Sequence, residues 1–193
     1  MSSMPVTERI TADEYLAREG EHERTWLVDG EIVVNEPRMA HQVLHGRLFA
    51  ALDRWVEAGE LRGLAVSPLD VRLDDYNVYA PDLLWYRAER VPVYDSPPPY
   101  AVPDLAIEIR SPSTWRYDIG TKKSTYERLG LAELWLVDGD ASVVLVFRRS
   151  APAVPTFDVA LEVDANETLS SPLLPDFVLA VGALFRRPPG VTQ

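Results

Sequence analysis

The pattern of apolar and polar positions predicts two helices and a hairpin early in the chain. Thr11 followed by Glu14 has the spacing of a capping box, which favours a short first helix starting near residue 11. Two apolar runs, TWLV and EIVV, are separated by Asp29-Gly30, a turn signal typical of a β-hairpin. Apolar residues then recur at helical spacing over about 39–58 and predict the longest helix.

Short apolar runs predict that the middle of the chain is built mainly of strands. We expect strands over residues 64–66, 69–73, 78–86 and 104–109. Pro81 lies inside the third run, and because proline cannot donate a ladder hydrogen bond, we expect this strand to lie at a sheet edge or to bulge there. The proline-rich segment 87–103 predicts a long loop.

The remaining segments mix helix and strand in the same way. A helix is predicted from about Tyr117 to Leu129, with Gly130 at its end. Further apolar segments follow at 134–137, 143–147, 157–163 and 177–185. This order predicts an α/β fold of the α+β type, in which a mixed sheet is flanked by helices. No repeat or linker divides the chain, so we expect a single domain over 1–193 with a flexible tail at 186–193.

Composition excludes several classes of protein. The chain has no cysteine, which excludes a disulfide scaffold, a zinc ribbon and a thiol nucleophile. No apolar run approaches the 18 or so residues of a membrane span, and the N-terminus has no secretory pattern. We therefore expect a cytoplasmic protein without membrane contact. The net charge of −11 argues against charge-driven, non-specific binding of nucleic acid, although a local basic face is compatible with it.

Two carboxylates interrupt otherwise apolar strands. Asp82 lies in YAPDLLW and Glu108 in DLAIEIR. The two-residue period of a strand places Ala106, Glu108 and Arg110 on one face. A buried carboxylate is unfavourable unless it is paired or holds a metal. Two such carboxylates on neighbouring strands would form a site of oxygen ligands for a hard cation.

The helix that follows offers a lysine for the same site. Asp118, Lys122 and Tyr126 are spaced four residues apart, so they share one face of a regular helix. A lysine directed at a bound metal could position a water, or help to deprotonate it, in phosphodiester hydrolysis.

The same residues also have a purely structural interpretation. Asp82 could pair with Arg110 across the sheet, and Glu108 could pair with Lys122 or Arg116. Asp118 and Lys122 could form an ordinary pair on the helix surface. Spacing alone leaves both interpretations open.

Three strings of the chain carry a family resemblance: PDLLW, PDLAIEIRSPST and DIGTKKSTYERLGLAELWLVD. They resemble the Uma family of restriction endonucleases, which belongs to the PD-(D/E)XK nuclease superfamily. Upstream strings in the same order, TADEYL, LVDGEI and SPLDVRL, also resemble the family. The resemblance covers residues from about 10 to 148. It implies a restriction-endonuclease-like core and Mg²⁺-dependent hydrolysis of DNA phosphodiester bonds, with Mn²⁺ as a substitute for Mg²⁺.

The resemblance also implies residue roles. Asp82 and Glu108 match the family's acidic metal ligands, and the backbone carbonyl of Ile109 would join them. The superfamily's lysine usually lies two residues after the glutamate, where this chain has Arg110. In the Uma pattern the lysine lies on the following helix, where Lys122 matches it. Asp82, Glu108 and Lys122 are therefore the expected catalytic residues, and the expected supporting residues are Asp118, Tyr126, His41 and Arg110.

Two departures from the family pattern favour an alternative function. The family commonly has a glutamate where this chain has Trp26, and Glu23 and Glu31 are out of register with it. Arg110 could also place a fixed cation beside Glu108 and compete with a metal. The alternative is a catalytically degenerate nuclease fold that acts as a binding or regulatory module.

Two further hypotheses concern zinc and oligomeric state. His41 and His45 are four residues apart on the predicted long helix, a spacing that can chelate zinc. The string HQVLH lacks the glutamate of HExxH, so metalloprotease chemistry is unsupported. Because many nucleases of the superfamily cut both strands as dimers, we expect a homodimer.

Overall fold

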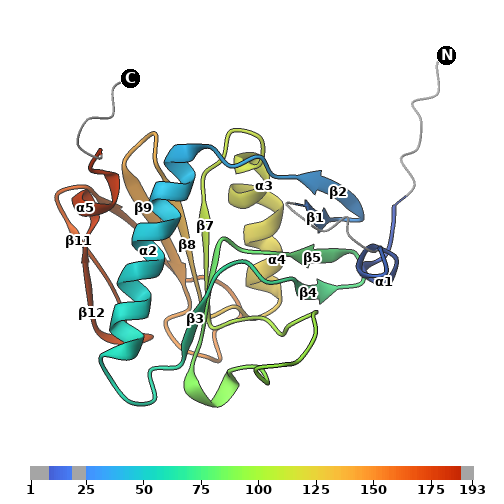
Figure 1. Cartoon of the computed structure of the whole chain (residues 1–193), viewed down its shortest axis with the longest axis horizontal. Coiled ribbons are helices and arrows are strands. Elements are labelled where there is room, and N and C mark those ends of the chain that lie inside the picture. The colour runs from blue at the N-terminus through green and yellow to red at the C-terminus, as the bar shows by residue number, and fades with distance from the viewer. Residues whose placement is uncertain (1–8, 19–24, 188–193) are drawn as a thin grey trace.

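A mixed sheet lies at the centre of the computed structural model, which describes residues 9–18 and 25–187 (Figure 1). In this described part the central sheet has six strands in the order β10-β9-β8-β7-β6-β3. Their bounds are, in that order, Val159–Asp164, Val143–Arg148, Glu133–Asp138, Leu105–Ile109, Leu83–Tyr86 and Leu64–Val66. β7 and β8 pair in parallel, and the other neighbours are antiparallel. The predicted mixed sheet is therefore confirmed.

A second, smaller sheet packs beside the first, in the order β2-β1-β5-β4. Its strands are β1 (Thr25–Val28), β2 (Glu31–Val34), β4 (Val71–Asp74) and β5 (Asn77–Tyr79). The predicted hairpin joins β1 to β2. Asp29 and Gly30 both have positive φ angles, 49° and 80°, as a type I′ turn requires. A separate hairpin near the C-terminus pairs β11 (Thr168–Ser171) with β12 (Leu174–Ala180); the sequence did not predict β11.

Helices cover the central sheet on both sides (Figure 1). The long helix α2 (Met39–Glu57) and α5 (Val181–Phe185) pack with the β11–β12 hairpin over one face. The small sheet and a helical segment pack over the other face; this segment comprises α3 (Trp115–Tyr117), the π-helical turn η2 (Asp118–Lys122) and α4 (Lys123–Arg128). The short helix α1 (Ala12–Leu16) begins in the predicted capping box, which Thr11 and Glu14 form. The long loop after β6 contains one short turn, η1 (Ala88–Arg90).

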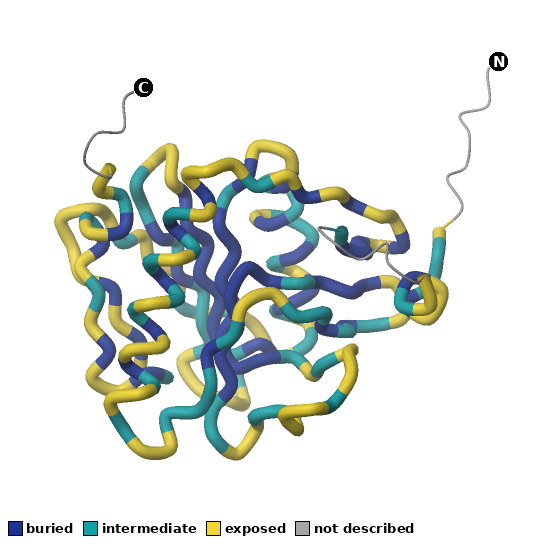
Figure 2. The backbone as a smooth tube through the Cα atoms, in the orientation of Figure 1, coloured by how far each residue is buried: buried dark blue, intermediate teal, exposed yellow. Residues whose placement is uncertain are grey.

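The alternation along β7 determines where its glutamate lies. Leu105, Ile107 and Ile109 join the core under α2, whereas Ala106 joins the core under the small sheet. Figure 2 shows that the strands in the middle of the central sheet are buried, and β6, β7 and β8 are buried at every residue. Since Glu108 is in phase with Ala106, its side chain points to the face shared with the small sheet and α4.

The prediction of one strand over residues 78–86 is wrong. The chain forms β5 in the small sheet and β6 in the central sheet, and the two are separated at Ala80, Pro81 and Asp82. Neither is an edge strand, because each lies between two neighbours. Proline has no N–H for a ladder and a restricted φ, so the chain leaves one sheet at Pro81 and enters the other. This break places Asp82 at the junction of the two sheets.

The predicted helix over 117–129 is only partly regular. The π-helical turn η2 lies inside it, between α3 and α4. Short π-helical turns are uncommon and often occur at functional sites. Gly130 follows the last turn with φ = 85°, as the sequence predicted. Of the predicted tail, residues 188–193 lie outside the described part, as does Glu23. No helix in the described ranges combines the length and apolarity that crossing a bilayer would require.

Candidate active site

Asp82 is held between the central sheet and the start of α2. Its Oδ2 accepts a hydrogen bond from the backbone N–H of Ile109 at 2.7 Å. The same oxygen lies 3.2 Å from Nε2 of His41, and Nε2 of His45 lies 3.1 Å from the Asp82 carbonyl oxygen. Because a carboxylate only accepts, His41 donates through Nε2. These contacts fix the Asp82 carboxylate beside β7, one residue from Glu108.

Glu108 lies in a buried cluster with three residues of the helical segment. Its Oε1 is 3.2 Å from Nζ of Lys122 and accepts a hydrogen bond from the Tyr126 hydroxyl at 3.0 Å. Nζ of Lys122 also pairs with Oδ1 of Asp118 at 2.9 Å. None of these four side chains is more than 2% exposed. The structure therefore brings together Asp118, Lys122 and Tyr126, as predicted, even though η2 is not a regular α-helix.

The charges of the cluster are unbalanced. If Asp82, Glu108 and Asp118 are all ionised, they oppose the single ammonium of Lys122, which leaves an excess of two negative charges. Burial raises the pKa of Glu108 to about 8, where Asp118 and Asp82 add to the shift and Lys122 opposes it. Burial also raises the pKa of Asp118, against the effect of Lys122. Burial alone would lower the pKa of Lys122, but its two carboxylate neighbours outweigh burial and raise it. The lysine therefore stays protonated at neutral pH.

This imbalance predicts that the metal-free protein loses stability as pH rises. Glu108 has a higher pKa when folded than when unfolded, so the folded state binds more protons between its usual pKa of 4.5 and about 8. The stabilisation is complete below pH 4.5 and is lost as pH rises through 8, with a slope of at most about 1.4 kcal/mol per pH unit. Thermal unfolding in EDTA from pH 5 to 9 should show this decline in the wild type and a flatter curve in Glu108→Gln. Parallel curves for the two proteins would contradict the assignment.

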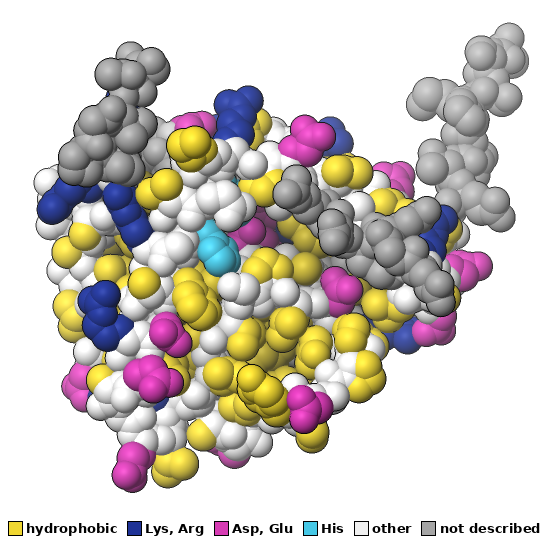
Figure 3. All heavy atoms as spheres, viewed as in Figure 1, with side chains coloured by type: hydrophobic (Ala, Val, Ile, Leu, Met, Phe, Trp, Pro, Cys, Tyr) yellow, Lys and Arg dark blue, Asp and Glu magenta, His cyan; other side chains and the backbone are white. Residues whose placement is uncertain are grey.

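A pocket of about 720 Å³ opens beside Asp82. Its described lining comes from the start of α2, the β1–β2 hairpin, the segment before β4 and the loop near Tyr100. Figure 3 shows histidine atoms at a hollow in this face, with acidic atoms within the hollow. Trp26 lines the pocket, and its ring centroid lies 3.4 Å from Nζ of Lys122. The indole therefore separates the pocket from the buried ammonium and forms a cation–π contact with it.

The donor set fits Mg²⁺ better than zinc. Asp82 and Glu108 would supply hard oxygen ligands, and a divalent cation would offset the negative charge that these carboxylates carry when ionised. Among the described residues, no three His, Asp or Glu side chains converge into a metal cage of their own. Mg²⁺ needs no such cage, because it uses one or two carboxylates and keeps waters or substrate phosphates as its other ligands. Within the same described residues, His41 and His45 have no third ligand for the zinc alternative.

The other predicted residues occupy different surroundings. Ile109 lies beside Asp82 through its N–H, and the role of its carbonyl as a ligand stays a prediction. The guanidinium of Arg110 pairs with Asp138 at 2.8 Å and lies 5.5 Å from the ring centroid of Trp115. β7 ends at Ile109, so the strand alternation that would have directed Arg110 toward Glu108 ends there.

Sequence reasoning missed three residues of this region. Trp26 was identified only as a departure from the family pattern, and nothing in the sequence indicated its contact with Lys122. His45, considered only as a partner of His41 in a zinc site, contacts the Asp82 carbonyl. Asn35 lines the pocket directly after β2. Asn35 lies in the short connection between β2 and α2, and no local pattern shows which cavity this connection lines.

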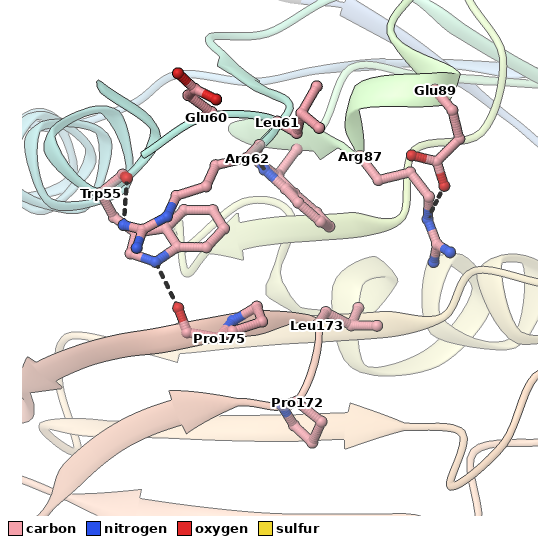
Figure 4. A pocket seen from close by; sticks show the side chains of 10 residues that line it. Trp55, Glu60, Leu61, Arg62, Arg87, Glu89, Pro172, Leu173 and Pro175 are labelled. Carbon is pink, nitrogen blue, oxygen red and sulfur yellow. Dashed lines mark hydrogen bonds and ion pairs between the residues drawn. The ribbon is translucent and has the colours of Figure 1, made fainter. Parts of the chain in front are cut away.

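A second pocket, of about 470 Å³, lies near the other end of α2 (Figure 4). Trp55 and Trp85 line it, and each indole N–H donates to a backbone carbonyl, of Pro175 and Arg62 respectively. Arg62 in turn donates to the carbonyl of Trp55 and stacks on its ring. Since the hydrogen-bond donors of these three side chains already have partners within the protein, they are less available to a ligand than the polar groups beside Asp82.

Comparisons with known proteins agree with this architecture. The model of the Uma2 family, described as "Putative restriction endonuclease", matches residues 12–182. A crystal structure described as a "putative nuclease belonging to DUF820" from Anabaena variabilis ATCC 29413 superposes with a TM-score of 0.76. It has 21% sequence identity, over 91% of this chain and 97% of that one. Likeness at this identity shows a shared fold, and it confirms the predicted fold class. No curated protein matches the chain.

Proposed function

The chain belongs to the Uma2 family, whose description is "Putative restriction endonuclease", and we propose that it is a Mg²⁺-dependent endonuclease that hydrolyses DNA phosphodiester bonds. Family membership and the nuclease-like fold support a nuclease. The observation that carries the finer proposal is the convergence of Asp82, Glu108 and Lys122 beside a pocket, where three buried carboxyl groups lie near one ammonium.

The proposal assigns each residue a role. Asp82 and Glu108, with the Ile109 carbonyl, would hold Mg²⁺, which would act as a Lewis acid and stabilise negative charge on the phosphate. Because Lys122 stays protonated, it orients the attacking water as a hydrogen-bond donor and does not act as a base. Asp118 fixes the lysine through its 2.9 Å ion pair.

Two other groups hold these residues in place. The Tyr126 hydroxyl donates to Oε1 of Glu108 and restricts that carboxylate. His41 donates to Oδ2 of Asp82 and orients it. Both act through the acidic residues and so are positioning residues in this proposal. Arg110, paired with Asp138, is left to a structural role.

One observation favours the second candidate, a binding or regulatory module on the same fold. Trp26 is 4% exposed and covers the ammonium of Lys122, while Glu108 is 1% exposed. A substrate would reach these groups only after the indole moved. If Trp26 closes the site permanently, the protein binds without cleaving. A folded protein that binds neither Mg²⁺ nor Mn²⁺ would favour this candidate.

Cleavage of supercoiled plasmid DNA by the purified protein tests the first candidate. We expect nicked or linear product with millimolar Mg²⁺ or Mn²⁺, and none after EDTA removes the metal. Asp82→Ala should abolish cleavage, whereas Asp140→Ala, which removes an exposed carboxylate near Arg110, should retain it. Equal cleavage by Asp82→Ala and wild type would refute the metal assignment. Linear product from single binding events would also support the homodimer, which stays a prediction.

A further inference from the structure

Two residues that line the pocket beside Asp82 each hold a buried polar atom without a partner. Within residues 9–18 and 25–187, neither Oδ1 of Asn35 nor Nδ1 of His41 has a hydrogen bond. Both side chains are more than nine-tenths buried, at 8% and 5% exposure. Both line the 720 Å³ pocket. Burying a polar atom without a partner is unfavourable, and such atoms in native proteins call for an explanation. A ligand in the pocket would supply the missing hydrogen bonds.

Oδ1 of Asn35 accepts hydrogen bonds, and Nδ1 of His41 accepts them when the ring is neutral. Oδ1 of Asn35 is an amide oxygen. Nε2 of His41 carries the ring proton, because it faces the carboxylate of Asp82 at 3.2 Å. In the neutral imidazole this leaves Nδ1 with a lone pair. The complementary ligand must therefore present N–H or O–H donors to this part of the pocket.

The walls of the pocket favour an uncharged, flat group. Its described lining contains no Lys or Arg and includes the carboxylates of Asp82 and Asp70, so a phosphate alone would find no cation there. Flat or apolar residues make up much of the rest: Trp26, Pro37, Pro68, Leu69, Pro98 and Tyr100. A volume of about 720 Å³ is within the range of pockets that hold small organic ligands. A planar heterocycle with N–H donors meets these conditions.

We propose that this pocket binds one unpaired nucleobase of the substrate, whose N–H donors reach Asn35 and His41. This inference rests on the proposed function and deepens it, because it specifies the substrate. The N–H donors on the Watson–Crick edge of a base are occupied in a paired duplex, so the base must be unpaired or flipped out of the helix. The favoured substrate is then a single strand, or a duplex with an unpaired nucleotide next to the cleaved bond.

Fluorescence anisotropy with labelled oligonucleotides tests the inference on the wild type. Ca²⁺ would replace Mg²⁺, so that binding is measured under conditions chosen to limit cleavage. We expect a duplex with one unpaired nucleotide to bind at least about tenfold more tightly than the perfect duplex. An abasic unit at the unpaired position should abolish this difference, because the base is what the pocket recognises. Equal affinity for the three probes, or preference for the perfect duplex, would overturn the inference.

Asn35→Leu provides an independent readout, because it should weaken binding of the unpaired probe without lowering the stability of the protein. Loss of the acceptor should weaken binding of the unpaired probe about 5- to 10-fold and leave binding of the perfect duplex unchanged. Since the substitution removes an unpartnered buried oxygen, the thermal midpoint should not fall. Asn166→Leu, in the exposed turn before β11, is the matched control and should change neither. A lowered midpoint with unchanged discrimination would indicate a structural asparagine and overturn the inference.

The failure of this inference can be distinguished from that of the proposed function. Titration with Mn²⁺ in the absence of nucleic acid reports the metal site alone. If the metal binds but an unpaired base gives no advantage, only the present inference fails. If no metal binds and unpaired probes still bind through Asn35, the inference holds for a binding module without nuclease activity.

Discussion

Replacing Lys122 with methionine is expected to reduce DNA cleavage by about 10²–10⁴-fold and to destabilise the protein. The ammonium lies 3.2 Å from Glu108 and 2.9 Å from Asp118 in a fully buried site. Methionine fills a similar volume but leaves both carboxylates without their cation. Removing one partner of a buried ion pair typically costs about 3–5 kcal/mol. Protonation of Glu108, whose pKa is raised to about 8, would offset part of this loss, so the destabilisation should be smaller at neutral pH than at pH 9.

Lys123→Met is the matched control for this prediction. Lys123 is adjacent in the sequence, but its ammonium lies 4.6 Å from the ring centroid of Phe147, outside the cluster. We expect near wild-type cleavage and a change in unfolding free energy below about 1 kcal/mol. Single-turnover cleavage rates and thermal unfolding of the two variants provide the comparison. Loss of cleavage in Lys123→Met with retention in Lys122→Met would show that the lysine is wrongly assigned.

Glu108→Gln is expected to reduce cleavage by at least about 10³-fold, because metal ions contribute several kcal/mol to the transition state. Glutamine can still accept hydrogen bonds from Lys122 and Tyr126, but it is a poor ligand for Mg²⁺. The variant also removes a carboxylate whose ionised form is unfavourable in the metal-free protein. It should therefore be less active yet more stable than wild type in EDTA near pH 9, which a merely structural glutamate would not show.

A second buried glutamate provides the control for Glu108→Gln. Glu133, at the start of β8, accepts hydrogen bonds from the Trp135 indole and the Ser171 hydroxyl. Burial raises its pKa too, but it lies on the side of the sheet that faces the β11–β12 hairpin. Glu133→Gln should therefore leave metal-dependent cleavage per folded molecule unchanged. A comparable loss of cleavage in this variant would mean that any disturbance of the sheet inactivates the protein.

Local sequence signals predicted most of the fold. The capping box at Thr11, the Asp29-Gly30 turn and the helical spacing of α2 each depend on residues close together in sequence, and all are confirmed. The alternation in β7 likewise placed Glu108 on the correct face. The sequence predicted that Pro81 disturbs the strand over residues 78–86. It did not predict that the strand ends there, because that depends on a second sheet with which β5 can pair.

The tertiary contacts of the site were harder to predict from the sequence. The spacing of Asp118, Lys122 and Tyr126 indicated one helix face, yet the π-helical turn η2 that carries the lysine has no sequence signal of its own. The cation–π contact between Trp26 and Lys122 depends on the packing of the β1–β2 hairpin against the helical segment. Such contacts join segments far apart in sequence, so no local pattern encodes them.

Calorimetric titration of the metal-free protein with Mn²⁺, for wild type beside Asp82→Ala, tests the central claim most directly. Mn²⁺ accepts oxygen ligands and generally binds more tightly than Mg²⁺. We expect binding near one ion per chain in the wild type, and its loss in a folded Asp82→Ala. Identical titrations of the two proteins, with or without a short DNA duplex present, would contradict the claim that Asp82 and Glu108 form a metal site.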